Sequence, residues 1–239
     1  MLSDADQRSA RLGSLSKEIH VPATFLQELV TFIADQLPAW RDHPDRTQET
    51  SEPRLSAQLC SHLNSAARRT KGWDILQFKQ EEPDATVKNR TLDLAASPCD
   101  ATIWVGGRRT TVFETILPIE CKRLPTPPEA GRDRREYVFS SKTTTGGIQR
   151  FKDGLHGATH NLAAMIGYIQ NETSSTWHKR ANEWIEELIA DAKPGWSSED
   201  HLQMRSEDTK RRMAVLVSSH PRTGGKDNIE LQHLWILMN

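Results

Sequence analysis

The segment Leu117–Leu124 restricts the fold of this chain more than any other stretch. Apolar residues alternate along it at the two-residue period of a β-strand, namely Leu117, Ile119 and Cys121. Glu120 and Lys122 therefore project from one face of that strand. Burying a carboxylate and an ammonium side by side is costly unless the two groups are paired or bind a metal ion. Two interpretations stay open: a structural ion pair, and a metal site in which Glu120 is a ligand.

Hydrophobic patterns place the other elements around this strand. Helical periodicity predicts one helix from Phe25 that ends near Pro38, a second that begins near Ser51–Pro53, a short one opened by Gly146–Gly147, and a long one around 177–189. Short apolar runs predict strands at 73–78, 90–96, 102–105, 112–124, 163–169, 213–217 and 229–237. The stretches 1–20, 41–50, 81–89, 125–147 and 194–210 are polar and are predicted to be arms, turns or loops. We therefore expect the strands at 73–78, 91–96, 115–124 and 164–169 to form one mixed sheet with helices on both faces.

The glycine pair at 106–107 gives the pairing register of two of these strands. If it forms the tip of a hairpin, residues whose numbers add to about 213 lie opposite each other, which places Glu120 against Asp93. Asp100 lies about seven residues nearer the tip. Because Pro98 is expected to break the strand or form a bulge, Asp100 remains the alternative partner, and Asp93 is preferred. Glu52, at the start of the second helix, either faces the same site or only complements the helix dipole.

Composition limits the class of protein. The 239 residues suit one domain over 51–239, preceded by an N-terminal arm and helix over 1–50. The net charge of −1 gives no whole-molecule attraction for nucleic acid, so a basic site must be local. Three cysteines without zinc-ligand spacing fit a reducing compartment, and neither a signal peptide nor a membrane-length apolar run is seen. We expect a cytoplasmic protein that does not enter a membrane.

Local basic residues and two histidines are further candidates for a binding site. The loop 125–147 and the helix that follows it contain the candidates for phosphate contacts, namely Arg132, Arg134, Arg135, Arg150 and Lys152. Acidic residues interleave with the loop arginines, so a solvated charged loop is the alternative. His156 and His160 are four residues apart, as zinc ligands on a helix are, but Gly157 weakens a helix there and we predict no zinc site.

At this point the chain resembles the PD-(D/E)xK nuclease superfamily, which has the restriction-endonuclease-like fold. The matching residues are Asp93 in Arg90-Thr91-Leu92-Asp93, then Glu120-Cys121-Lys122, then Gln149 after the glycine pair. The resemblance covers roughly residues 51–170. The family's Pro-Asp dipeptide is absent at Asp93, and Pro98-Cys99-Asp100 is a near match that keeps Asp100 as the alternative.

The resemblance implies a three-layer α/β/α domain with an N-terminal helical extension that hydrolyses phosphodiester bonds with Mg²⁺ or Mn²⁺. It implies that Asp93, Glu120 and the carbonyl of Cys121 are metal ligands. Lys122 would orient the attacking water or stabilise the developing charge. Gln149 would help to hold substrate or the lysine; an exposed helix glutamine is the alternative.

The resemblance also suggests a substrate and a role. DNA is favoured over RNA as the substrate, and restriction or phage defence is the suggested role. The first alternative is a nucleic-acid-binding or assembly subunit that has kept the fold and lost catalysis. The second is an interaction protein in which Glu120 and Lys122 form only a structural ion pair. Whether the chain acts alone, as a homodimer or with a partner subunit stays open.

Overall fold

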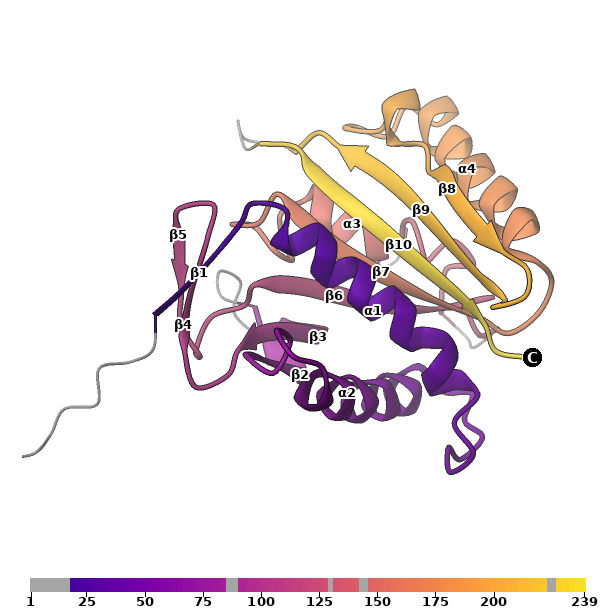
Figure 1. The fold of residues 1–239 in the computed structure, drawn as a ribbon. Helices are drawn as coiled ribbons and strands as arrows, with labels where there is room; N and C mark the ends of the chain where they lie inside the picture. The colour runs from indigo at the N-terminus through magenta and orange to yellow at the C-terminus, as the bar shows by residue number, and fades with distance from the viewer. Residues whose placement is uncertain (1–17, 85–89, 129–130, 142–145, 223–226) are drawn as a thin grey trace, which may run out of the picture.

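A computed structural model describes residues 18–84, 90–128, 131–141, 146–222 and 227–239, and these form a mixed α/β domain (Figure 1). The main sheet contains seven strands, in the order β2 (Leu76–Pro83), β3 (Thr91–Pro98), β6 (Leu117–Leu124), β7 (Leu162–Ile169), β10 (Ile229–Leu237), β9 (Met213–His220) and β8 (Gln203–Asp208). The neighbours of β7 run parallel to it, and every other pair is antiparallel. The expected mixed sheet is confirmed.

A smaller sheet projects from one end of the domain (Figure 1). It contains β1 (Glu18–Val21), β4 (Thr102–Val105) and β5 (Arg108–Thr110), with β4 in the middle. The chain therefore leaves the main sheet after β3, forms the β4–β5 hairpin, and returns as β6.

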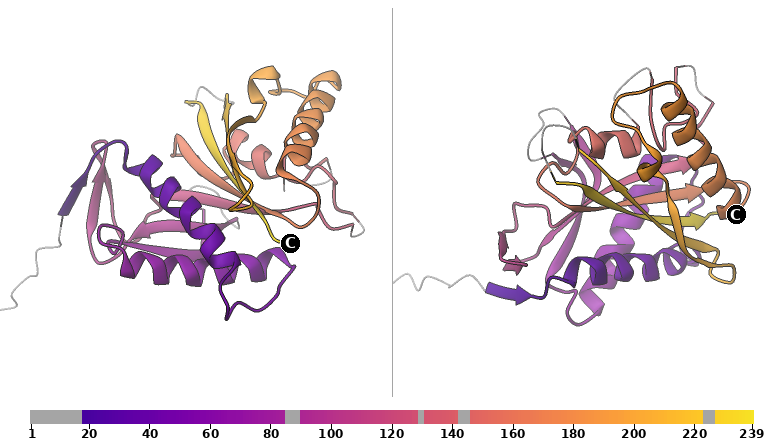
Figure 2. Two further views of the ribbon diagram at one scale, coloured as in Figure 1. Left: turned by 45° about the vertical axis from the view of Figure 1, so that its right-hand side comes forward. Right: turned by 90° about the horizontal axis from the view of Figure 1, so that it is seen from above.

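Helices cover both faces of the main sheet (Figure 2). They are α1 (Phe25–Arg41), α2 (Glu52–Arg69), α3 (Gly147–Lys152) and α4 (Ser174–Ala190), with a 3₁₀ turn at Ser198–Asp200. Because side chains alternate along a strand, the strands β6, β7, β9 and β10 each contribute to two separate apolar clusters. One cluster joins α1 and α2 to residues such as Ile119 and Cys121; the other joins α3 and α4 to residues such as Leu124. The helix α1 thus packs into the same core as the sheet.

The predicted register is confirmed. Leu94 pairs with Ile119 and Ala96 with Leu117, and the β4–β5 hairpin continues the same count, so that the numbers of paired residues add to 213 in both sheets. The turn at the tip is glycine because both of its residues, 106 and 107, have positive φ.

Several predicted boundaries are wrong, each because tertiary contacts override a local signal. The helix α1 continues through Pro38 to Arg41, whose guanidinium is buried and donates to backbone carbonyls of the β8–β9 turn and of β10. The strand β2 begins at Leu76 and continues to Pro83, since its polar end pairs with β3. The strand β6 begins at Leu117, not at 112. Part of the stretch 194–210 is the edge strand β8, not a loop, because it pairs with β9.

Candidate functional site

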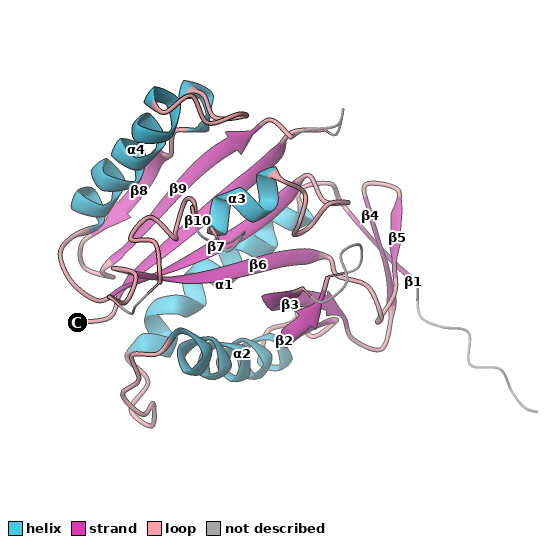
Figure 3. Cartoon of the chain, turned by 180° about the vertical axis from the view of Figure 1, so that it is seen from behind, coloured by secondary structure: helices cyan, strands magenta, loops and turns pink. Residues whose placement is uncertain are grey.

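The candidate site lies where β3 and β6 separate. The ladder between the two strands covers only residues 94–96 and 117–119, and beyond it the strands diverge (Figure 3). Carboxylates take the place of strand carbonyls along the freed edge of β6. Asp93 Oδ2 accepts the Cys121 N–H at 2.7 Å, and Glu52 Oε2, from the start of α2, accepts the Arg123 N–H at 3.1 Å. The split in the sheet therefore gathers acidic groups from three elements.

These oxygens surround the ammonium group of Lys122. Its Nζ lies 2.8 Å from Glu120 Oε1, 3.0 Å from the carbonyl oxygen of Cys121, 3.2 Å from Glu52 Oε1 and 3.8 Å from Asp93 Oδ2. The predicted pairing of Asp93 with Glu120 and Lys122 is thus realised. Glu52 joins them. Of its two interpretations, the structure therefore agrees with the one in which Glu52 faces the site.

The buried carboxylate of Glu120 has further basic side chains beside it, from α3 and the turn after it. Arg150 NH1 donates to Oε1, the oxygen that also contacts Lys122. His156 Nδ1 lies 3.2 Å from Oε2, yet neither of these two atoms has a well-aligned hydrogen-bond partner among the described residues. The sequence predicted that Arg150 contacts a nucleic acid, and it did not predict that His156 lies beside Glu120.

The glycine pair before α3 allows this approach. A Cβ on Gly146 would lie 2.5 Å from the backbone of Phe139, and one on Gly147 would lie 2.5 Å from the Met165 methyl group and 3.5 Å from Lys122 Cγ. Only glycine lets α3 pack against β6 and β7 this closely. This close packing sets Arg150 against Glu120.

The charges of the cluster perturb one another. Burial, and then the neighbouring carboxylate of Glu120, raise the pKa of Asp93 to about 7. Burial alone would also raise the pKa of Glu120, but Lys122, His156 and Arg150 hold it well below its usual range. Burial would lower the pKa of Lys122, yet the three carboxylates raise it well above its usual range. Lys122 is therefore a firmly protonated cation in this structure.

Exposure increases from one side of the cluster to the other. The side chains of Glu120 and Lys122 are 0% and 5% exposed, whereas Glu52 is 16% and Asp93 29% exposed. A ligand would therefore reach the cluster from the side of Asp93 and Glu52. This partial exposure of Asp93 screens its interactions with neighbouring charges.

The other predicted carboxylate and the predicted glutamine are not part of the cluster. Asp100 is exposed in the turn after β3, where its φ of 52° is one that Asp tolerates. Gln149 is half-buried on α3, and its Oε1 accepts the backbone N–H of Ser140 at 3.2 Å. Its side chain thus ties α3 to the preceding loop.

The loop arginines that were predicted to contact phosphates form ion pairs with acidic residues of the protein itself. Arg132 pairs with Glu136, and Arg134 and Arg135 reach Glu187 on α4. Parts of their loop, residues 129–130 and 142–145, lie outside the described residues. Arg134 is the most exposed of the three, with 74% of its side chain accessible. The acidic neighbours seen in the sequence account for these pairs.

Lys152 begins a buried chain of hydrogen bonds on the α3–α4 side. The chain links Lys152, Asp200, His220, Ser218, His233, Tyr137 and Trp235 in that order. The indole N–H of Trp235 donates to the Tyr137 hydroxyl. An arrangement in which each following group donates to the next, as far as the Asp200 carboxylate, satisfies the whole chain with both histidines neutral. Burial holds the pKa of His220 below its usual range and that of His233 well below it. Lys152 is therefore a buried structural cation.

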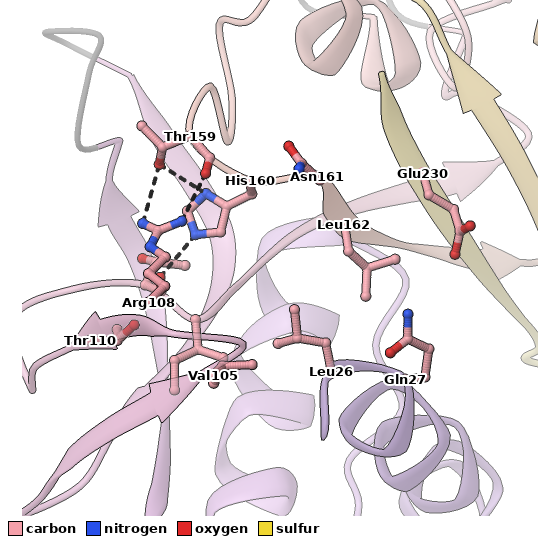
Figure 4. Close-up of a pocket in the computed structure, with 12 residues that line it drawn as sticks. Leu26, Gln27, Val105, Arg108, Thr110, Thr159, His160, Asn161, Leu162 and Glu230 are labelled. Carbon is pink, nitrogen blue, oxygen red and sulfur yellow. Dashed lines mark hydrogen bonds between the residues drawn. The ribbon is translucent and has the colours of Figure 1, made fainter. Parts of the chain in front are cut away.

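A separate cavity of about 370 Å³ lies between the small sheet, α1 and the start of β7 (Figure 4). Arg108 and His160 line it, and no residue of the carboxylate cluster does. His160 Nε2 bonds to the carbonyl of Thr115 at 2.9 Å, so this histidine does not act together with His156. Both histidines follow α3 in irregular structure and share no helix.

The oxygens around Lys122 are of the type that a hard divalent cation prefers. Within the described residues, no group of three or more His, Cys, Asp and Glu side chains is arranged to hold a metal ion directly. The position at which three carboxylates and one carbonyl converge is taken by the ammonium. The donor atoms are oxygens, as a divalent cation prefers, and in this structure they are arranged around an ammonium.

No family model matches the chain. Searches of curated proteins and of solved structures also return no significant match. In the described part of the chain, no helix is long and apolar enough to cross a membrane.

Proposed function

We propose that this protein is a metal-dependent nuclease that hydrolyses phosphodiester bonds, with DNA as the favoured substrate. The observation that carries the proposal is the convergence of Glu52, Asp93, Glu120 and the Cys121 carbonyl on the Lys122 ammonium at the split between β3 and β6. The resemblance to the PD-(D/E)xK superfamily supports it, since the resemblance implies the roles of Asp93, Glu120, the Cys121 carbonyl and Lys122 and a restriction-endonuclease-like sheet.

Each residue has a role that follows from its position. Asp93, Glu120 and the carbonyl of Cys121 would hold Mg²⁺ or Mn²⁺, with Glu52 as a further carboxylate on the exposed side. The metal would supply a polarised phosphate and a more acidic water. Lys122, which carries its charge in a nearly dry site, would orient the attacking water and stabilise the charge that develops on the phosphate. Water adds to phosphorus while the bond to one ester oxygen breaks.

The direction of access agrees with a large substrate. The cluster is closed on the side of Glu120 and partly exposed on the side of Asp93 and Glu52. A phosphate in a strand of DNA could therefore approach without entering a deep pocket. A role in restriction or phage defence is what the resemblance suggests for such an activity.

The test is incubation of the pure protein with plasmid and with linear single strands in Mg²⁺, Mn²⁺ or chelator. We expect metal-dependent cleavage by the parent protein, abolished in Glu120→Gln and retained in Asp100→Asn, which serves as the matched acidic control. Cleavage that persists in chelator, or that Glu120→Gln retains in full, would contradict the proposal.

A second candidate is a nucleic-acid-binding or assembly subunit of the same fold without catalysis. The observation that favours it is the internal neutralisation of Glu120, which is fully buried beside Lys122, Arg150 and His156. Such a protein would bind DNA with the same affinity in Mg²⁺ and in chelator and would cleave it in neither.

A further inference from the structure

The cavity between the small sheet, α1 and the start of β7 has opposite charges at its two ends (Figure 4). Arg108 lies at one end and Glu230 at the other, with the apolar side chains of Leu26 and Leu162 between them in this view. Within the described residues, neither charged group is in an ion pair. The volume of about 370 Å³ is within the range of small-molecule sites. The cavity therefore has the size and the charges of a site for a dipolar ligand.

The guanidinium of Arg108 is fixed by only some of its donors. Its NH1 donates to the Thr159 carbonyl at 2.8 Å, and its NH2 lies 3.4 Å from the hydroxyl oxygen of the same threonine. The carboxylate of Glu114, whose pKa Arg108 helps to lower, accepts its hydrogen bonds from Thr111 instead. A guanidinium has five N–H donors, so those that remain can bind the two oxygens of a carboxylate.

The rest of the cavity has groups that match an ammonium and a peptide unit. Glu230 is half-buried near the start of β10, where its Oε1 accepts from the Gln232 amide at 2.7 Å, and its carboxylate keeps further acceptor capacity. The side-chain amides of Gln27 and Asn161 also line the cavity, and they form no hydrogen bond to the described part of the chain. An amide has both donors and an acceptor, which are what the N–H and C=O of a peptide need.

The backbone sets the separation of the two ends. Arg108 is held at Thr159, and Glu230 pairs with Leu162, three residues further along the chain. Three residues span at most about 10 Å. A ligand that reaches both ends has its charges separated by about that distance, which a peptide of two or three residues provides.

We propose that this cavity binds a short apolar peptide with free ends, with its carboxylate on Arg108 and its ammonium on Glu230. The inference is independent of the proposed nuclease function, because no residue of the carboxylate cluster lines the cavity.

The test is an NMR titration of the isotope-labelled parent protein with the tripeptide Ala-Leu-Ala. We expect saturable shifts of the amides that surround the cavity, with a Kd of about 1 mM or tighter. Two blocked forms of the peptide are the matched ligands: N-acetylation removes the ammonium, and C-terminal amidation removes the carboxylate. Each blocked form should bind at least about tenfold more weakly, the scale for losing a hydrogen bond between charged groups.

Variants of the protein assign each end of the peptide. Arg108→Gln should weaken the free peptide at least about tenfold and should leave the amidated peptide unchanged, since that form has no carboxylate to lose. Glu230→Gln should do the same for the free and the acetylated peptide. Arg109→Gln is the matched control, because Arg109 is the exposed neighbour of Arg108 on β5 and does not line the cavity. The spectrum of each variant shows whether it is folded.

Three outcomes would overturn the inference. The first is the absence of saturable shifts around the cavity. The second is equal binding of the free peptide and both blocked forms, because the charged ends would then contribute nothing. The third is equal weakening by Arg108→Gln and Arg109→Gln, which would assign the effect to the overall charge of the hairpin. DNA cleavage by the parent and by Glu120→Gln tests the nuclease function separately.

Discussion

Replacing Lys122 by methionine tests whether its ammonium stands in for a divalent cation. The substitution keeps the aliphatic chain and removes the charge that Glu120, Glu52 and Asp93 share. Removing one partner of a buried ion pair costs roughly 3–5 kcal/mol. Because Glu120 keeps Arg150, and methionine carries no desolvation penalty, we expect the lower end of that range, about 3 kcal/mol. For a chain of this length this lowers Tm by about 6–12 °C in chelator.

A divalent cation should reverse much of this loss. With the ammonium gone, Mg²⁺ or Mn²⁺ can occupy the centre of the carboxylates, and a ligand at ~100 times its Kd adds about 2.7 kcal/mol to the free energy of unfolding. The gain in Tm on adding metal should therefore be larger for Lys122→Met than for the parent. Replacing both Glu120 by glutamine and Lys122 by methionine should restore part of the stability in chelator and lose the metal response.

Lys152→Met is the matched control for this experiment. Lys152 is as buried as Lys122 and is also paired with a carboxylate, that of Asp200, which lies in a different cluster. Its loss should lower Tm by a similar amount, but metal should raise the Tm of this variant no more than that of the parent. The reasoning fails if Lys122→Met is as stable as the parent in chelator, or if metal rescues both lysine variants equally.

Four further outcomes are expected. Asp93→Asn should abolish the metal-induced rise in Tm and stabilise the metal-free protein. The stabilisation should grow from about pH 4 to about pH 7 and level off above it, because a folded-state pKa raised to about 7 costs the parent stability as pH rises from the ordinary pKa of Asp toward that value; melts from about pH 4 to 8 check it. Asp100→Asn should change neither the metal-induced rise in Tm nor the stability of the metal-free protein. A loss of the metal-induced rise in this variant would transfer the ligand role to Asp100. Gly147→Ala should cost about 1–3 kcal/mol in urea unfolding, since its Cβ would meet a methionine methyl group and a backbone carbonyl at under 3 Å; a neutral result would mean that α3 can shift. Ser218→Ala should cost about 1–3 kcal/mol by interrupting the buried chain, against under about 0.5 kcal/mol for its exposed neighbour Ser219→Ala, and equal values would show that the chain adds no stability.

The parts of this protein that sequence alone determined depend on short-range rules. The count across the hairpin tip predicted the pairs of the β3–β6 ladder, and Asp93 and Glu120 lie just beyond its last pair, Leu94 with Ile119. Alternation placed Glu120 and Lys122 on one face of β6, and apolar runs located most of the strands of the main sheet. Alternation within a strand and pairing between adjacent strands depend only on the sequence of the strands themselves and of the turn that joins them.

The tertiary structure decided which side chains from other elements lie against β6. Glu52 enters from a helix 68 residues earlier than Glu120, and Arg150 arrives only because Gly146 and Gly147 let α3 pack closely. The edge strand β8 and the last turn of α1 form against the local signal, since each gains hydrogen bonds from distant segments. Local periodicity carries no information on these contacts, because they join residues that are far apart in the sequence.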